Sequence, residues 1–279
     1  KKYPVMYNEI SIDTDEKTFF KSLSRNGAPE FKKENSSEPG FFRYVFVDRD
    51  RAIDKDVNFI NPLLAYPVVK FQVIYANSDK IKGALIGLKG ELKAGFTKEQ
   101  LAKTAWDDYV NVDKYYMATG YTVDAFINYH WSEMKKDGVR DLPEEKFAQN
   151  VYYRIRNHVL FQSSYLSDKV FAYILGSLLY QRDIKSELII SISNRTGTLK
   201  DVLFDNEIRY VIKVGSKYYF NCTDHSNPDE LTESMLGNEA YIIKEPNKKT
   251  GAQEIIPFTL PDAPAADNTL HQEVNAIYD

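Results

Sequence analysis

The chain has 279 residues, of which 43% are hydrophobic, and a formal net charge of only −4 at pH 7. This length and composition fit a globular protein with one large domain or two smaller ones. Because acidic and basic residues are interspersed and the net charge is small, nothing suggests nucleic-acid binding or electrostatic attachment to a membrane. No stretch is long and apolar enough to cross a bilayer, so we expect no transmembrane segment within this sequence.

Residues 1–95 are predicted to form a mostly β region, part of a β-sandwich. Strand-like runs at 41–47 and 68–75 are separated by polar loops, one of which contains a Pro-Gly pair. The segment 79–95 carries four glycines among lysines, a composition typical of turns or of an irregular connection. A second domain is therefore expected to begin after this segment.

The pattern of residues 96–245 predicts an α+β domain that begins with helices. Thr97 and Gln100 match a capping box, in which each side chain satisfies an exposed backbone donor at the start of a helix. Further helices are predicted over 122–137 and 144–162, the latter preceded by a proline. The first half of this domain is therefore expected to be helical.

A buried amphipathic helix is predicted next, over 165–182, where apolar residues recur at helical spacing. A strand at 187–193 follows, and then a hairpin in which 208–214 and 217–221 flank a Gly-Ser turn. The proline-rich tail, 246–279, is predicted to be an extended linker that leads to the first strand of a following, truncated domain. We therefore expect this chain to be a fragment of a longer protein.

Three short motifs occur in order along the α+β region. Ser-Asp-Lys at 167–169 opens the buried helix, Phe-Asp-Asn-Glu-Ile at 204–208 enters a strand, and Phe-Asn-Cys-Thr-Asp at 220–224 ends the hairpin. Their order, within about residues 145–270, resembles the transglutaminase-like domains of bacterial multidomain proteins. The resemblance implies a papain-like core of helices packed on an antiparallel sheet, with a Cys, His, Asp triad. It also implies a location in the periplasm or at the cell surface, with neighbouring domains of the same protein as partners.

The triad positions implied by the resemblance hold Leu166, Asn206 and Asn221, so all three chemical groups are absent. In an active triad, a helix N-terminus and an imidazole lower the thiol pKa from about 8.5, and the third residue orients the imidazole. Leu166 has no nucleophile, Asn206 cannot take up a proton near pH 7, and Asn221 offers only a hydrogen bond. Acyl transfer by the usual triad is therefore not expected.

The candidate binding residues are tyrosines, amides and one carboxylate near the triad positions. They are Tyr152, Tyr165, Asn206, Tyr219, Asn221 and Asp224. Exposed tyrosine rings stack on sugars or anchor peptides, whereas most aromatic residues in strands cover a core face. Amides at the base of a cleft donate and accept hydrogen bonds, which suits recognition better than catalysis. A peptide or a glycan is therefore the expected kind of ligand.

Cys222 is the only cysteine and the alternative nucleophile. It follows Asn221 on the strand, so alternation points it to the opposite face, and a buried cysteine that packs as a small hydrophobe is the more ordinary interpretation. His130, His158 and His271 lack the convergent ligands that a metal site needs, and no phosphate-binding glycine loop is present. We therefore expect no metal and no cofactor.

Three functions remain open. The favoured one is a non-catalytic transglutaminase-like module whose groove binds a peptide or glycan, or whose fold holds neighbouring domains in place. An open groove at Leu166, Asn206 and Asn221 favours ligand binding, whereas a groove plugged by Leu166 leaves the structural role. The second is an active cysteine enzyme with relocated residues, for which Cys222 is the nucleophile. The third is an unrelated α+β protein, in which the three triad positions do not converge.

Overall fold

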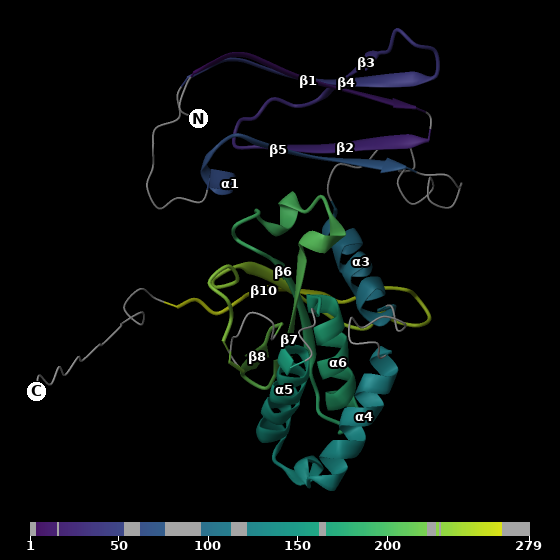
Figure 1. Ribbon diagram of the computed structural model, residues 1–279, viewed down its shortest axis with the longest axis vertical. Helices are drawn as coiled ribbons and strands as arrows, with labels where there is room; N and C mark the ends of the chain where they lie inside the picture. The colour runs from purple at the N-terminus through teal and green to yellow at the C-terminus, as the bar shows by residue number, and fades with distance from the viewer. Residues whose placement is uncertain are drawn as a thin grey trace, which may run out of the picture.

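The computed structural model describes residues 4–15, 17–52, 62–75, 96–112, 122–161, 166–221, 227–228 and 230–263. Within these ranges, helices and antiparallel sheets combine in an α+β fold made of two units (Figure 1). One unit consists mainly of strands, and in the other a layer of helices packs on a larger sheet. The predicted α+β class is therefore confirmed.

Two antiparallel sheets face each other in the first unit, which we call the β unit. One sheet has the order β1 (Val5–Asp15), β4 (Phe41–Arg51) and β3 (Lys32–Asn35), and the other pairs β2 (Thr18–Arg25) with β5 (Val68–Tyr75), which follows the short helix α1 (Pro62–Ala65). Aromatic rings fill the space between the sheets, because the ring centroid of Phe20 lies 4.8 Å from that of Phe31 and 4.5 Å from that of Tyr44. The β unit therefore has a small aromatic core of its own.

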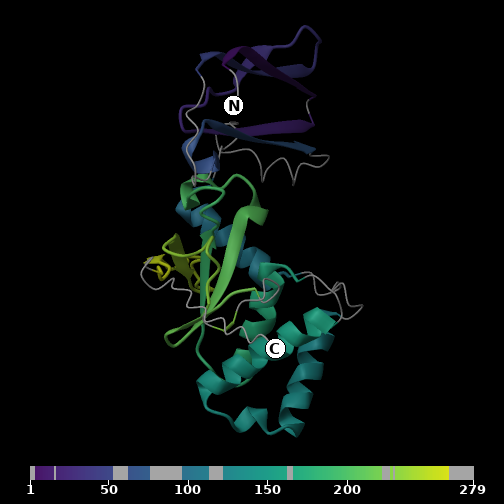
Figure 2. The ribbon, with the colours of Figure 1, turned by 60° about the vertical axis from the view of Figure 1, so that its left-hand side comes forward.

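The second unit, which we call the α+β unit, packs helices on a five-stranded antiparallel sheet (Figure 2). Its α-helices are α3 (Lys98–Val110), α4 (Val123–Lys136), α5 (Glu144–Phe161) and α6 (Asp168–Tyr180). In sheet order, its strands are β10 (Ile255–Thr259), β9 (Glu239–Ile243), β6 (Glu187–Ile192), β7 (Ile208–Val214) and β8 (Lys217–Tyr219). Short 3-10 turns are η1 (Val139–Asp141), η2 (Leu199–Asp201) and η3 (Asp205–Glu207). In the described ranges, no helix has the length and apolarity needed to span a membrane.

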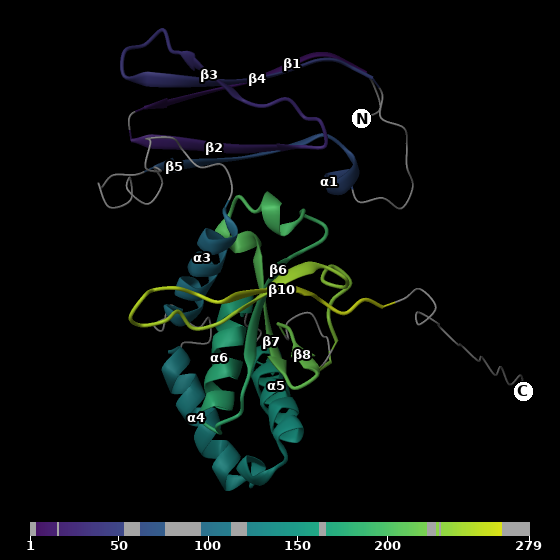
Figure 3. The ribbon, with the colours of Figure 1, turned by 180° about the vertical axis from the view of Figure 1, so that it is seen from behind.

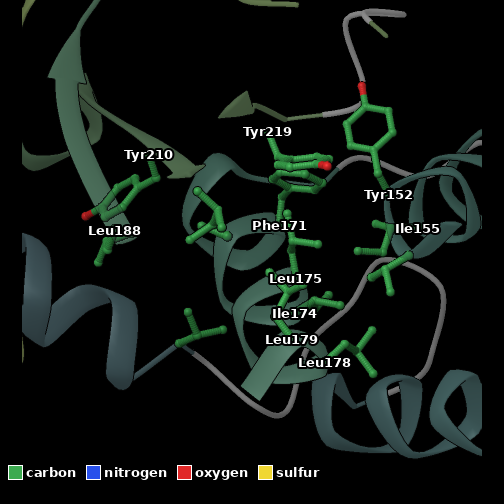
Figure 4. Close-up of a cluster of buried hydrophobic side chains, with 14 of the residues drawn as sticks. Tyr152, Ile155, Phe171, Ile174, Leu175, Leu178, Leu179, Leu188, Tyr210 and Tyr219 are labelled. Atoms are coloured by element: carbon green, nitrogen blue, oxygen red, sulfur yellow. The ribbon is translucent and has the colours of Figure 1, made fainter. Parts of the chain in front are cut away.

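Helix α6 lies at the centre of the helical layer, because it contacts β7 as well as α3, α4 and α5 (Figure 3). Apolar side chains surround most of its circumference, which is the pattern of a helix buried on several sides. Figure 4 shows Phe171, Ile174, Leu175, Leu178 and Leu179 projecting from it into the core, and all five are at most 1% exposed. Truncation of one of these side chains to alanine costs about 2–5 kcal/mol.

Local sequence signals fix the ends of several elements. Thr97 caps α3, and its side chain and that of Gln100 form the predicted capping box. Gly215 has φ +59° in the turn between β7 and β8, a left-handed conformation that glycine adopts at little cost. Strand β8 then leads directly to Phe220 and Asn221, so the hairpin delivers Asn221 to the start of α6.

The segment after residue 245 differs from the expected linker. Strand β10 pairs with β9 in the same sheet, and Leu260 is 1% exposed in the core on that side of the sheet. A turn closed by Asn247 and Gly251 joins the two strands. The prolines that suggested a linker are compatible with β10 because it is the edge strand, where Pro257 removes no ladder bond that the sheet requires. The α+β unit therefore extends at least to Leu260.

Candidate functional site

Asn221 and Leu166, two of the three predicted triad positions, meet between the end of the hairpin and the start of α6. The Asn221 side-chain amide donates one hydrogen bond to the Leu166 carbonyl oxygen and another to Asp168 Oδ1, both 2.8 Å long. Leu166 and Asn221 are 3% and 2% exposed. Because a buried amide is stable only when its polar atoms are paired, these bonds explain why asparagine fits this position.

Asp168 continues this arrangement toward the solvent. Its second oxygen, Oδ2, forms an ion pair with Arg209 Nε at 2.7 Å, so the carboxylate lies between an amide and a guanidinium group. Asp168 is also the first residue of α6, where the helix dipole stabilises a negative charge. The Arg209 guanidinium lies over the Phe220 ring, with its Cζ 5.1 Å from the ring centroid. Sequence analysis missed the roles of Asp168 and Arg209, although an aspartate in the first helical turn was a visible signal.

Asn206, the third predicted position, lies on the surface above this network. It is exposed, and it lines a small hollow of about 190 Å³. The other lining residues are Asp108, Ser167, Asp168, Lys169, Asp205, Ile208, Arg209 and Tyr210. Leu166 and Asn221 are absent from this lining, so one of the three triad positions faces the hollow and the other two lie buried beneath it.

Three carboxylates, of Asp108, Asp168 and Asp205, and two cations, Lys169 and Arg209, line the hollow. Burial raises the pKa of Asp108, and Lys169, whose Nζ lies 3.7 Å from Asp108 Oδ2, opposes that rise. Burial also raises the pKa of Tyr210, and the charges of Asp108 and Asp205 raise it further. Anionic surroundings disfavour a thiolate or an oxyanion. Among the described lining residues, Ser167 carries the one aliphatic hydroxyl group, and none of those residues is a histidine that could activate it.

The prediction that Tyr152 and Tyr219 bind a ligand is wrong, because both side chains are buried. Tyr152 is 0% exposed and Tyr219 is 1% exposed. The Tyr152 ring packs 5.9 Å from Phe171 and 6.1 Å from Tyr219, measured between centroids, so these rings fill the core around α6 (Figure 4). Three further candidates, Tyr165, Cys222 and Asp224, lie outside the described residues.

The histidines of the helical layer show no metal site. His130 is 7% exposed and packs between Phe126 and His158, with ring centroids 4.3 and 5.3 Å away. Burial lowers the pKa of His130 to about 4, with smaller contributions from His158 and Arg154. Among the residues that the structure describes, no group of three or more His, Cys, Asp or Glu side chains could hold a metal ion. His271 lies outside these residues.

Comparison with known proteins gives little further guidance. No protein-family model matches the chain, and no curated protein matches it. A crystal structure described as that of a "putative protease from Parabacteroides distasonis ATCC 8503" aligns over 79% of this chain with 18% sequence identity and a TM-score of 0.33. The chain spans 41% of the length of that protein. A similarity this weak leaves the function to be argued from the site itself.

Proposed function

We propose that this chain is a non-catalytic module with a transglutaminase-like, papain-like core, and that it serves as a structural scaffold in an exported bacterial protein. One observation carries the proposal. The Asn221 amide, buried at the position where the resemblance implies the triad aspartate, donates to both Leu166 O and Asp168 Oδ1. Both of its donors therefore bind the protein itself, which favours a structural role over ligand recognition.

The buried leucine supports the same conclusion. Leu166 takes the place of the nucleophile and belongs to the hydrophobic core around α6. Its side chain is only 3% exposed, so this position offers little surface to a ligand. The contacts of Leu166 and Asn221 do not support the binding of a peptide or glycan at these two positions. An active enzyme with Cys222 as nucleophile is the alternative, and an activity assay distinguishes it from the scaffold.

Partly buried ion pairs that join the two units support the scaffold role. Arg25 of β2 pairs with Asp201 at 3.1 Å and donates to the Thr196 carbonyl oxygen at 2.9 Å. The Arg25 and Asp201 side chains are 11% and 19% exposed. Gly197 allows this approach, because a Cβ built there would lie 2.7 Å from Arg25 Nη1. The loop between β6 and β7 therefore packs closely against the β unit.

A second contact of the same kind involves Glu207, the neighbour of Asn206. Lys70 of β5 pairs with Glu207 and donates to the Asp201 carbonyl oxygen at 3.2 Å. The other Glu207 oxygen accepts from the backbone N–H groups of Leu203 and Phe204 at 2.9 and 3.1 Å. The turn where the resemblance implies the triad histidine thus holds the neighbouring unit.

Removal of both interface cations tests the scaffold role. The double variant Arg25→Leu/Lys70→Met leaves Asp201 and Glu207 partly buried without their cationic partners, which costs about 3 kcal/mol. We expect its unfolding in urea to separate into two transitions and its radius of gyration in solution X-ray scattering to rise. The matched control is Arg43→Leu, which removes an exposed ion pair with Asp13 inside the β unit. This control should cost less than about 1 kcal/mol and keep one transition.

Two results would contradict the proposal. One is a double variant that keeps the scattering profile and the single unfolding transition of the control. The other is amine incorporation into casein, or casein cleavage, that the purified chain catalyses and that Cys222→Ala abolishes. The second result would instead establish the enzyme with relocated residues, whereas the first would remove only the scaffold role.

A further inference from the structure

The opposite end of α6 carries a larger and differently built hollow between α4 and α6. It has a volume of about 560 Å³. Its lining residues are Tyr109, Asp124, Ile127, Asn128, Tyr173, Gly176, Ser177, Tyr180, Gln181 and Ser186. None of them lines the hollow at the start of α6, so the two sites share no residue.

The floor of this hollow is one face of α6. Tyr173, Gly176, Ser177 and Tyr180 follow the spacing i, i+3, i+4 and i+7, which places them on the same side of the helix. The two small residues lie between two tyrosines, so the helix surface is low in the middle and raised at both ends. The tyrosines are about 10 Å apart along the helix axis, from a rise of about 1.5 Å per residue.

Gly176 has a specific reason to be glycine. Glycine inside a helix costs about 0.5–1 kcal/mol relative to alanine. Here a Cβ would lie 2.4 Å from the hydroxyl oxygen of Tyr109, so alanine would collide with it. The glycine therefore lets a tyrosine hydroxyl reach the helix backbone at the floor of the hollow. Burial, helped by Tyr173, raises the pKa of Tyr109 to about 12, so this hydroxyl keeps its proton.

Tyr180 and Ser186 line both this hollow and a second one. The Tyr180 side chain is 81% exposed, and the second hollow has a volume of about 630 Å³. Asp183, Lys185, Glu187, Lys213 and Lys244 are among the residues that line the second hollow. An exposed aromatic ring with a hollow on each side offers a face on which a flat, partly apolar ligand can stack.

The chemistry of the first hollow selects the class of ligand. Asp124 and Asn128, one turn apart on α4, present a carboxylate and an amide, and Ser177 and Gln181 add a hydroxyl and a second amide. Such groups pair with a ligand that alternates hydroxyl donors and acceptors. Among the described lining residues there is no lysine or arginine, which disfavours an acidic ligand, and Ile127 is the one aliphatic hydrophobic side chain, which disfavours an amphipathic helix.

We propose that the hollow between α4 and α6, with Tyr180 as the stacking platform, binds a neutral oligosaccharide. Sugar rings have an apolar face for Tyr180 and Tyr173 and hydroxyl groups for Asp124, Asn128 and Gln181. The hydroxyl of Tyr109 donates or accepts at the floor. This site is independent of the triad positions, and the proposal holds or fails apart from the scaffold role.

Calorimetric titration of the whole chain with uncharged hexasaccharides tests the proposal. Suitable probes are cellohexaose, xylohexaose, mannohexaose, maltohexaose and chitohexaose. We expect at least one of them to bind, and we expect Tyr180→Ala to weaken that binding about tenfold because an exposed ring contributes contact without supporting the fold. The matched control is Tyr129→Ala on α4, which removes another exposed tyrosine that lies outside the lining. Its dissociation constant should stay within about twofold of the wild type.

Two further variants keep the test decisive. Asp124→Asn conserves size and keeps one acceptor oxygen but removes the charge, and we expect it to weaken binding less than Asp124→Ala does. The proposal is overturned if none of the five neutral probes binds, or if Tyr180→Ala binds as tightly as Tyr129→Ala. It is also overturned if only acidic oligosaccharides or peptides bind. Circular dichroism of each variant confirms that a lost signal reflects the site and not unfolding.

Discussion

The two ends of α6 use polar side chains in opposite ways. At the start of the helix, the buried Asn221 amide and the Asp168 carboxylate bind each other, and Arg209 completes the arrangement. At the far end, Tyr180 is 81% exposed and borders two hollows. One helix thus carries a polar cluster that holds the fold together and a polar surface that remains open to a ligand. Leu166 and Asn221, which the sequence singled out, are therefore buried, whereas the accessible hollow beside Tyr180 lies at the other end of the helix.

Charge balance explains why asparagine suits the buried position 221. A buried carboxylate needs paired partners, and Asp168 has them in the amide of Asn221 and the guanidinium of Arg209. An amide donates without adding charge, so asparagine suits a position next to aspartate. An aspartate at 221 would place two carboxylates in contact.

The largest effect is therefore expected for Asn221→Asp. At pH 7 the new carboxylate faces Asp168 Oδ1 at the distance of the present 2.8 Å hydrogen bond, and we expect a loss of about 4 kcal/mol in the free energy of unfolding. Repulsion raises the folded-state pKa of this carboxyl pair above its unfolded value. The folded state therefore takes up a proton first as the pH falls, and the destabilisation should shrink as the pH falls from 7 toward the unfolded-state pKa of about 4. Urea unfolding at pH 7 and pH 5 measures it, and equal losses at both would contradict the charge argument.

Asn221→Leu should have the next largest effect. Leucine has a similar size but donates no hydrogen bond, so the Leu166 carbonyl and Asp168 Oδ1 lose their donors at a cost of about 2–3 kcal/mol. The control is Asn206→Leu, because Asn206 is exposed and should change the stability by less than about 0.5 kcal/mol. The urea midpoints of the two variants give the comparison. Similar midpoints would show that the Asn221 bonds stabilise the fold no more than a surface side chain does.

His130 extends the contrast to a buried polar group without the pairing that Asn221 has. Neither of its ring nitrogens has a hydrogen-bond partner among the described residues. Its pKa is lowered from 6.5 to about 4, chiefly by burial, then by His158 and Arg154, and is raised slightly by Glu133. The folded state thus binds fewer protons, so stability is complete above about pH 6.5 and is lost as the pH falls toward 4.

The expected loss for the wild type is about 2 kcal/mol between pH 7 and pH 5. His130→Phe keeps an aromatic ring against Phe126 and removes the titration, so its stability should fall less over the same range. His158, whose pKa burial also lowers, should leave a small residual slope in that variant. Chemical unfolding at several pH values measures both proteins, and parallel profiles would show that His130 is not the titrating group.

The smallest effect concerns the floor of the open end. Gly176→Ala should destabilise the wild type, because the added Cβ would lie 2.4 Å from the Tyr109 hydroxyl. In the Tyr109→Phe background the hydroxyl is gone, and the ring carbon Cζ lies 3.6 Å from the added Cβ, which is an ordinary contact. Gly176→Ala should then raise the free energy of unfolding by about 0.5–1 kcal/mol. A double-mutant cycle in urea measures this reversal of sign. The same sign in both backgrounds would exclude the hydroxyl as the reason for glycine.

Local patterns in the sequence predicted the elements well because their causes are local. The capping box at Thr97, the helical spacing that produced α6 and the Gly215 turn each depend on neighbours a few residues away. The pairing of β10 with β9 was missed because Pro257 is a linker signal in sequence but is tolerated in an edge strand. Whether a strand lies at the edge is decided only by the assembled sheet.

The candidate site was predictable only in part, for a similar reason. The sequence singled out Leu166 and Asn221, and these two residues do meet. The burial of Tyr152 and Tyr219 follows from packing on α6, which no local pattern encodes. The open hollow was missed altogether. Its residues come from α3, α4, α6 and the start of β6, and no short motif joins them.

Exchange of side-chain amide protons, measured by NMR on the ¹⁵N-labelled chain, tests the closed structural site most directly. Asn221 and Asn206 carry the same side-chain amide. The amide of Asn221 is 2% exposed and donates two hydrogen bonds, whereas Asn206 lies on the surface. A closed site predicts that the Asn221 amide protons exchange far more slowly than those of Asn206, at rates close to those of core backbone amides such as Ile190. Equally fast exchange at both asparagines would mean that the groove is open to water, and it would contradict the structural role assigned to Asn221.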